Sequence, residues 1–78
     1  MEKLRAVWGA RIRRARQAAG YSQAQFAVAL GVNQANVSRW ERGLASPHDN
    51  RRRIIADLLG VSADSLFSYD TNGDTEAA

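Results

Sequence analysis

Two short helices in close succession, encoded by residues 22–43, constrain the fold of this chain more than any other feature. Ser22 predicts the start of the first helix, because its hydroxyl and the side chain of Gln25 can satisfy each other's backbone amides in a capping box. An apolar stripe that includes Phe26 follows at helical spacing. Gly31 predicts the end of that helix, since glycine adopts the left-handed backbone of a helix C-terminus without strain.

A second helix is predicted after a turn of about three residues, with Asn33 as its N-cap. Helical spacing places Val37, Trp40 and Leu44 on an inner face. The outer face is largely polar and consists of Gln34, Ala35, Ser38, Arg39 and Arg42. Two helices joined by a short turn with a glycine form a helix-turn-helix, and such an outer face can hydrogen-bond to base edges in a major groove.

Residues 22–47 contain several features at fixed offsets from one another. They include a small residue in the first helix of the pair, the turn glycine, an apolar anchor in the second helix of the pair and a terminal glycine. They are Gln23, Ala27, Gly31, Val37, residues 38–43 (SRWERG) and Pro47. This pattern resembles the phage repressor and Cro type of helix-turn-helix, also called xenobiotic-response-element-like regulators. The resemblance extends from about Ile12 to Phe67. It implies a compact five-helix, lambda-repressor-like all-α domain that binds duplex DNA.

The other helices are predicted from the spacing of apolar residues and from stop signals. The first helix of the chain is predicted over Lys3–Ala19, with one apolar stripe at Leu4, Trp8, Ile12, Ala15 and Ala19. Trp8 on this stripe is core, or alternatively a surface for another subunit. Gly9 weakens the helix by about 1 kcal/mol relative to alanine.

The fourth helix is predicted to open with Ser46 as N-cap and Pro47 as first residue, and to bury Ile54, Ile55, Leu58 and Leu59. A short fifth helix, Ala63–Phe67, closes a domain of residues 1–69, with Leu66 in the core. Phe67 and Tyr69 are core or a small apolar patch. Residues 70–78, which lack hydrophobic side chains except alanine, are predicted to be a disordered acidic tail.

Size and composition exclude several classes of protein. A chain of 78 residues buries a modest core, and it shows no Ser-His-Asp set, paired carboxylates or phosphate loop, so we expect no enzyme and no cofactor. There is no cysteine, and the single histidine, His48, lacks a second ligand at metal-binding spacing, so no metal site or small-molecule ligand is expected. Neither a membrane span nor a signal peptide is visible, which favours a cytoplasmic location.

The charge is unevenly distributed. Residues 1–59 hold all 11 Lys and Arg residues against four acidic residues, a net charge of +7, whereas residues 60–78 hold four acidic residues and no basic one. The basic part contains the helix-turn-helix, and ten of the eleven cations are arginines, whose fork suits phosphate and guanine. A polyanion partner fits this distribution, although an arginine-rich solvated surface would show it as well.

The candidate base-reading residues lie on the second helix of the motif: Gln34, Ala35, Asn36, Ser38 and Arg39. The amides of Gln34 and Asn36 can bond adenine, and Arg39 can fork onto guanine. Asn36 could instead only cap the first turn of its helix. Ala35 could touch a thymine methyl group or nothing.

The candidate phosphate-binding residues are Gln23, Arg42 and Arg51. The resemblance implies a backbone contact for Gln23, at the start of a helix whose free amides favour an anion. Arg42 stands beside the terminal glycine, where a cation meets a phosphate more readily than a base. The run 51–53 of three arginines could add phosphate contacts or form a solvated face.

The resemblance further implies a partly buried structural ion pair between Arg16 and Glu41, whereas Arg11 and Arg13 are predicted to be solvated. One helix reads only a few base pairs, so a homodimer on two half-sites is expected. Together these features predict a sequence-specific transcriptional regulator, a repressor, that reads the major groove with residues 34–42. The alternative is a protein-interaction module, such as an antitoxin, with the same fold.

Overall fold

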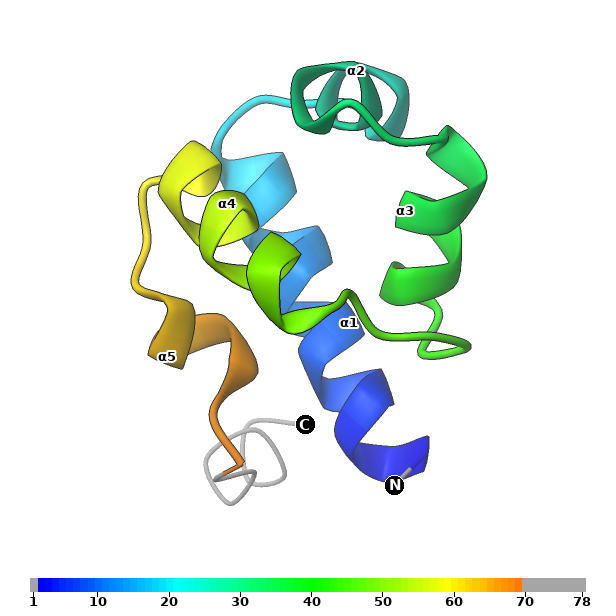
Figure 1. The fold of residues 1–78 in the computed structure, drawn as a ribbon, viewed down its shortest axis with the longest axis vertical. Helices are drawn as coiled ribbons and strands as arrows, with labels where there is room; N and C mark the ends of the chain where they lie inside the picture. The colour runs from blue at the N-terminus through cyan, green and yellow to red at the C-terminus, as the bar shows by residue number, and fades with distance from the viewer. Residues whose placement is uncertain (1, 70–78) are drawn as a thin grey trace.

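A computed structural model describes residues 2–69, which form five helices and no strand (Figure 1). Their bounds are α1 Glu2–Ala18, α2 Gln23–Leu30, α3 Gln34–Glu41, α4 Asp49–Leu59 and α5 Ala63–Phe67. The all-α, five-helix prediction is therefore confirmed. The predicted tail, residues 70–78, lies outside the described residues.

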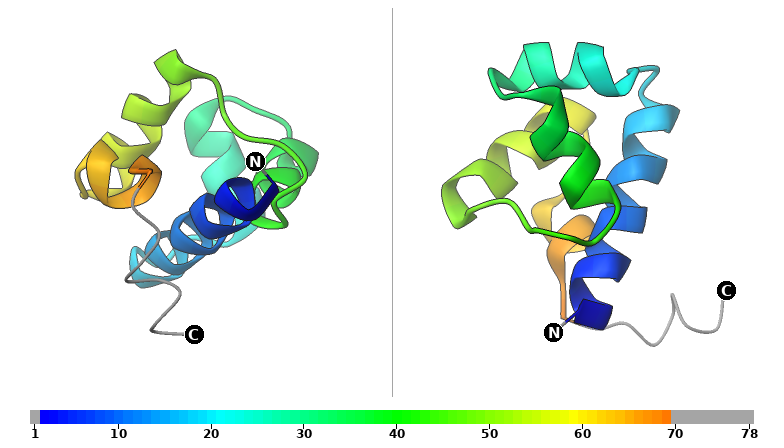
Figure 2. Two further views of the ribbon diagram at one scale, coloured as in Figure 1. Left: turned by 90° about the horizontal axis from the view of Figure 1, so that it is seen from below. Right: turned by 90° about the vertical axis from the view of Figure 1, so that its right-hand side faces the viewer.

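The long helix α1 forms the base on which the others are arranged. It packs against α3 and α5, while α2 packs against α3 and α4 against α5. Figure 2 shows α3 and α4 on different sides of the molecule, joined by an extended loop, with α2 across one end. In the helix-turn-helix pair, α2 and α3, it is thus α3 that packs directly against α1, and one side of α3 is left uncovered.

The predicted helix ends are largely confirmed. Ser22 and Gln25 form the capping box, and the Ser22 hydroxyl accepts a hydrogen bond from the backbone N–H of Gln25 at 3.0 Å. Ser62 caps α5 in the same way, by accepting from the Ser65 amide at 3.1 Å. Gly31 ends α2 with φ of +72°. Asn33 occupies the N-cap position of α3, but its side chain makes no capping hydrogen bond.

The core is one cluster of apolar side chains drawn from all five helices: Trp8, Ile12, Phe26, Ala27, Leu30, Val37, Trp40, Ile55, Ala56, Leu59, Leu66 and Phe67. Trp8 is only 4% exposed, which confirms its assignment to the core and excludes the alternative of an exposed surface. Phe67 is buried as well, whereas Tyr69 is 75% exposed and lies edge-on to the Trp8 ring. Ala19 and Leu44 are exposed and lie beyond the ends of α1 and α3, so their predicted burial was wrong.

The start of α4 differs from the prediction. The helix begins at Asp49 with His48 as N-cap, because the amides of Arg51 and Arg52 both donate to the His48 carbonyl. Pro47 is buried in the preceding loop instead of opening the helix, and its carbonyl accepts from Arg52 Nε at 2.9 Å.

The buried face of α4 is also rotated from the predicted one. Ile54 is 52% exposed, and Ala56 takes its place beside Ile55 and Leu59 in the core. One turn earlier on this face, the Arg52 guanidinium carbon lies 4.6 Å from the centroid of the Trp8 ring, a cation–π contact. An arginine therefore completes the apolar face of α4 by covering an aromatic ring.

Arg11 is not solvated as predicted. It is half-buried, and its Nη1 donates to the Ser68 carbonyl at 3.2 Å and to the Leu66 carbonyl at 3.3 Å. Trp8 Nε1 donates to the same Ser68 carbonyl at 2.9 Å. These bonds tie the end of α5 to the side of α1. No helix within residues 2–69 is long and apolar enough to cross a bilayer.

Candidate nucleic-acid interface

The outer face of α3 presents polar side chains on a helix that is fixed from within. Val37 is fully buried and Trp40 is 7% exposed, and both belong to the core. The predicted base-reading residues Gln34, Ala35, Asn36 and Arg39 are exposed, and Ser38 is half-buried. Because the anchors and the exposed side chains share two turns of helix, the exposed face has one fixed orientation.

An ion-pair network fixes α3 to α1. Arg16 Nε donates to Glu41 Oε2 at 2.6 Å and Arg16 Nη2 donates to Glu41 Oε1 at 3.1 Å, so the contact is bidentate. The two side chains are 8% and 3% exposed. Arg16 Nη1 also donates to the carbonyl of Tyr21, just before α2 begins, at 2.7 Å. One guanidinium thereby connects α1 to both helices of the motif.

Gln23, at the start of α2, joins the same network. Its Nε2 donates to Glu41 Oε1 at 3.0 Å, and the side chain is half-buried. The Gln23 side chain is therefore not simply solvated. The bond to Glu41 uses one N–H of the amide and holds the first turn of α2 beside the last turn of α3.

Gly9 allows the backbones of α1 and α3 to approach closely. A Cβ atom built on Gly9 would lie 2.3 Å from the Trp40 carbonyl oxygen and 2.7 Å from that of Glu41. Such distances leave no room for any side chain, and backbone atoms cannot swing away. The sequence indicated Gly9 only as a weak point of the first helix. A usable signal was present, because Gly9 lies seven residues before Arg16 and so on the same helix face.

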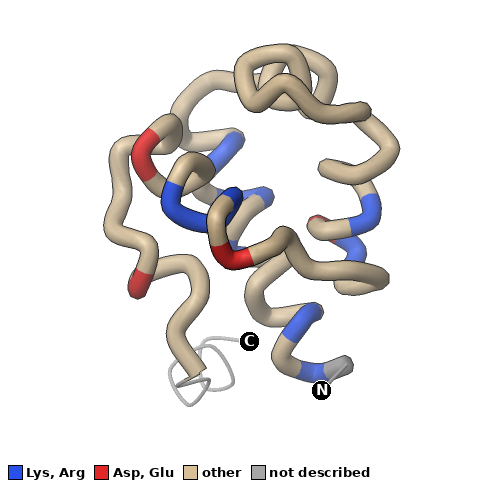
Figure 3. The backbone as a smooth tube through the Cα atoms, viewed as in Figure 1, with Lys and Arg blue, Asp and Glu red and all other residues tan. Residues whose placement is uncertain are grey.

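The predicted phosphate-binding arginines differ in their surroundings. Arg42 follows α3 as its C-cap and is exposed. Arg51 is half-buried, and its Nη1 donates to the Leu30 carbonyl at the end of α2 at 3.3 Å. Arg51 therefore helps to hold α2 against α4. Figure 3 shows further cationic positions along α1, at the carboxyl end of α3 and along α4.

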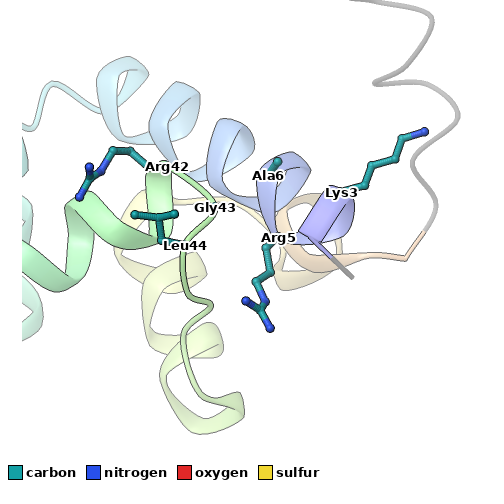
Figure 4. Close-up of a pocket in the computed structure, with 6 residues that line it drawn as sticks. All are labelled: Lys3, Arg5, Ala6, Arg42, Gly43 and Leu44. Atoms are coloured by element: carbon teal, nitrogen blue, oxygen red, sulfur yellow. The ribbon is translucent and has the colours of Figure 1, made fainter.

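Sequence reasoning did not single out two cations that the structure places near Arg42. Lys3 and Arg5, in the first turns of α1, line an open depression of about 590 Å³ together with Arg42, Gly43 and Leu44 (Figure 4). The first turns of α1 lie nearly forty residues from Arg42 in the sequence, and only the packing of α1 on α3 brings these side chains to one surface.

Known proteins share this motif. A helix-turn-helix family model matches residues 12–66. The chain is 42% identical over 60 residues to the uncharacterized HTH-type transcriptional regulator YazB of Bacillus subtilis (strain 168), an alignment that covers 77% of the chain and 87% of YazB.

Two longer proteins of the same organism are also similar. The HTH-type transcriptional regulator ImmR is 36% identical over 62 residues, which cover 80% of the chain and 49% of ImmR. The SPbeta prophage-derived uncharacterized HTH-type transcriptional regulator YonR is 33% identical over 61 residues, which cover 78% of the chain and 56% of YonR. The chain thus spans about half the length of these two relatives.

Proposed function

The chain belongs to the repressor and Cro type of helix-turn-helix proteins, and we propose that it inserts α3 into the major groove of duplex DNA and reads base edges there. Its family makes it a DNA-binding transcriptional regulator. The observation that carries the proposed reading is the exposed, polar outer face of an α3 that is anchored on its inner side by Val37 and Trp40. A fixed helix with free donors and acceptors is what direct readout requires.

The proposal divides the exposed side chains between two tasks. Gln34, Asn36 and Arg39 read bases, since amides pair with adenine and a guanidinium with guanine. Ala35, which is exposed, and Ser38, which is half-buried, lie between them on the same face and complete the surface that enters the groove. Arg42, beyond the last turn of α3, holds a backbone phosphate, and the first turn of α2 around Gln23 meets a second one through its free amides.

Arg51 has a smaller part in this proposal. Its guanidinium already donates to the Leu30 carbonyl, so only its remaining N–H groups are left for a phosphate. The net charge of +7 on residues 1–59 supports a polyanionic partner and long-range attraction to it.

We further propose that two copies bind together and that binding represses transcription. A single α3 spans only a few base pairs, so two copies on inverted half-sites about one helical turn apart give a longer operator. A compact protein on such an operator excludes other proteins from the same stretch of DNA, which is the simplest form of repression.

Replacing Arg39 and Arg42 separately tests the two tasks. Arg39→Ala should relax the choice of base at one position of each half-site and cost about 1 to 3 kcal/mol of binding free energy. Arg42→Ala should weaken binding to all sequences alike and flatten the dependence of log K on log salt by about one. Titrations of both variants against a panel of single-base operator variants, at several salt concentrations, measure both quantities. Equal losses on every sequence for the two variants would contradict a base-reading role for Arg39.

A further inference from the structure

We infer that Arg5, at the start of α1, holds a further phosphate of the DNA backbone, distinct from those held by Arg42 and by the first turn of α2, so that the DNA-binding surface extends onto the first helix. This inference rests on the proposed function. It concerns the open depression of Figure 4, in which Arg5 and Arg42 lie on the two sides of Leu44.

The position of Arg5 relative to α3 is fixed by two close backbone contacts. Gly9 brings α1 against the carbonyl groups of Trp40 and Glu41. Gly43, with φ of +75°, places the loop after α3 so near to α1 that a Cβ atom on it would lie 2.9 Å from Ala6 Cα. Ala6 is the neighbour of Arg5 in the chain. The first turns of α1 therefore move together with α3.

Apart from Arg42, the positive charge at this edge of the interface comes from α1. The loop that follows Arg42, residues 43–48 with sequence GLASPH, contains no Lys or Arg. The cations lining the depression are Lys3, Arg5 and Arg42, and the other residues given for it, Ala6, Gly43 and Leu44, are uncharged. Three cations with no acidic partner among these lining residues form a local concentration of positive charge that favours an anion.

The placement of Lys3 and Arg5 is unfavourable for α1 itself. Both lie in its first turns, where the helix dipole disfavours cations. Both are also exposed, so neither contributes to the core. Residues that oppose a local preference without a gain in packing are expected at functional sites, and here the compensation is the phosphate charge.

The geometry favours the DNA that α3 already contacts over any other anion. In the right-hand view of Figure 2, α3, the loop after it and the first turns of α1 lie on the side of the molecule that faces the viewer. Figure 4 shows Lys3 directed away from Arg42, so Lys3 adds to the positive potential while Arg5 makes the contact. An arginine fork holds the two oxygens of one phosphate.

The test compares Arg5→Ala with a matched control on the same helix. Arg14 is also an exposed arginine of α1, but nine residues further along it lies on the opposite side of the helix and lines a depression formed with α5. Binding to a labelled duplex of random sequence is titrated between about 50 and 200 mM NaCl. Arg5→Ala should flatten the slope of log K against log salt by about 0.9, whereas Arg14→Ala should keep the slope of the unchanged protein. Arg5→Lys should restore most of the slope, because it retains the charge.

Two other results would overturn the inference in different ways. If Arg5→Ala keeps the unchanged slope while Arg42→Ala loses about one unit, DNA binding stands and the contact by α1 is wrong. If the unchanged protein binds no duplex, the proposed function fails together with this extension of it. The thermal unfolding temperature of Arg5→Ala should be equal to or slightly above that of the unchanged protein, since the side chain is exposed and its cation opposes the dipole of α1.

Discussion

Glu41→Gln is expected to destabilise the protein by about 3 to 5 kcal/mol, because it leaves Arg16 charged and unpaired in the interior. The two carboxylate oxygens accept from Arg16 twice and from Gln23 once. An amide of the same shape has only one acceptor oxygen, and its NH2 group would face donors. For a domain of this size the melting temperature should fall by more than about 10 °C in a thermal scan by circular dichroism.

A second carboxylate provides the control. Asp49 also pairs with an arginine, Arg52, at 2.8 Å, but the Asp49 side chain is 93% exposed. Asp49→Asn makes the same chemical change at a solvated pair and should cost at most about 1 kcal/mol. If the two substitutions lower the melting temperature equally, burial of the Arg16 pair does not govern its contribution, and the account of how α3 is fixed to α1 is wrong.

Gly9→Ala should also destabilise strongly, although helix propensity alone favours alanine by about 1 kcal/mol. The new methyl group would meet two carbonyl oxygens of α3 at less than 3 Å. Relief requires α1 and α3 to move apart, which loosens the packing of Trp8 and Ile12 as well. We expect a net loss of about 2 to 3 kcal/mol in the free energy of unfolding, measured by urea titration.

The neighbouring position provides a control in which helix propensity acts alone. Ala10 is exposed on the same helix, so Ala10→Gly should cost only the propensity difference of about 1 kcal/mol. The sign of the change in unfolding free energy for Gly9→Ala decides whether α1 and α3 are in close contact at this position. A more stable Gly9→Ala protein would mean that α1 and α3 are not in close contact and that Gly9 is an ordinary helical glycine.

Features that depend on nearby residues were predictable from the sequence. The Ser22 capping box and the stop at Gly31 involve partners within a few residues, so the residue types alone indicate them. The exposure of Gln34 and Arg39 follows from helical spacing once Val37 and Trp40 are taken as anchors. These local rules were sufficient for the five helices and for the outer face of α3.

Features that depend on distant partners were not predictable in this way. Ser46 and Pro47 have the residue types of a helix start, yet Pro47 is buried in a loop, where its carbonyl accepts a hydrogen bond from Arg52. The arginine run 51–53 looked solvated or phosphate-binding, since nothing in the sequence shows that Arg52 covers Trp8. Charge indicates where an arginine prefers to be, but not which aromatic ring or carbonyl the fold places beside it.

The candidate site also combines features that the local sequence predicts with features that depend on distant partners. Arg39 and Arg42 were predicted as DNA contacts from the motif, because the motif fixes their place on and just after α3. The contribution of Arg5 depends on how α1 crosses the end of α3, which is set by the contacts at Gly9 and Gly43. Gln23 was predicted to bind a phosphate, and its bond to Glu41 appears only when the two helices are packed together.

The most direct test of the central claim, that α3 reads bases in duplex DNA, is selection of bound duplexes from a random pool by the purified protein at about 150 mM salt. The account predicts enrichment of inverted half-sites whose centres are about one helical turn apart, with the same experiment on Arg39→Ala losing the preference at one position of each half-site. A pool that shows no enriched sequence after selection would contradict the claim and would favour the protein-interaction module.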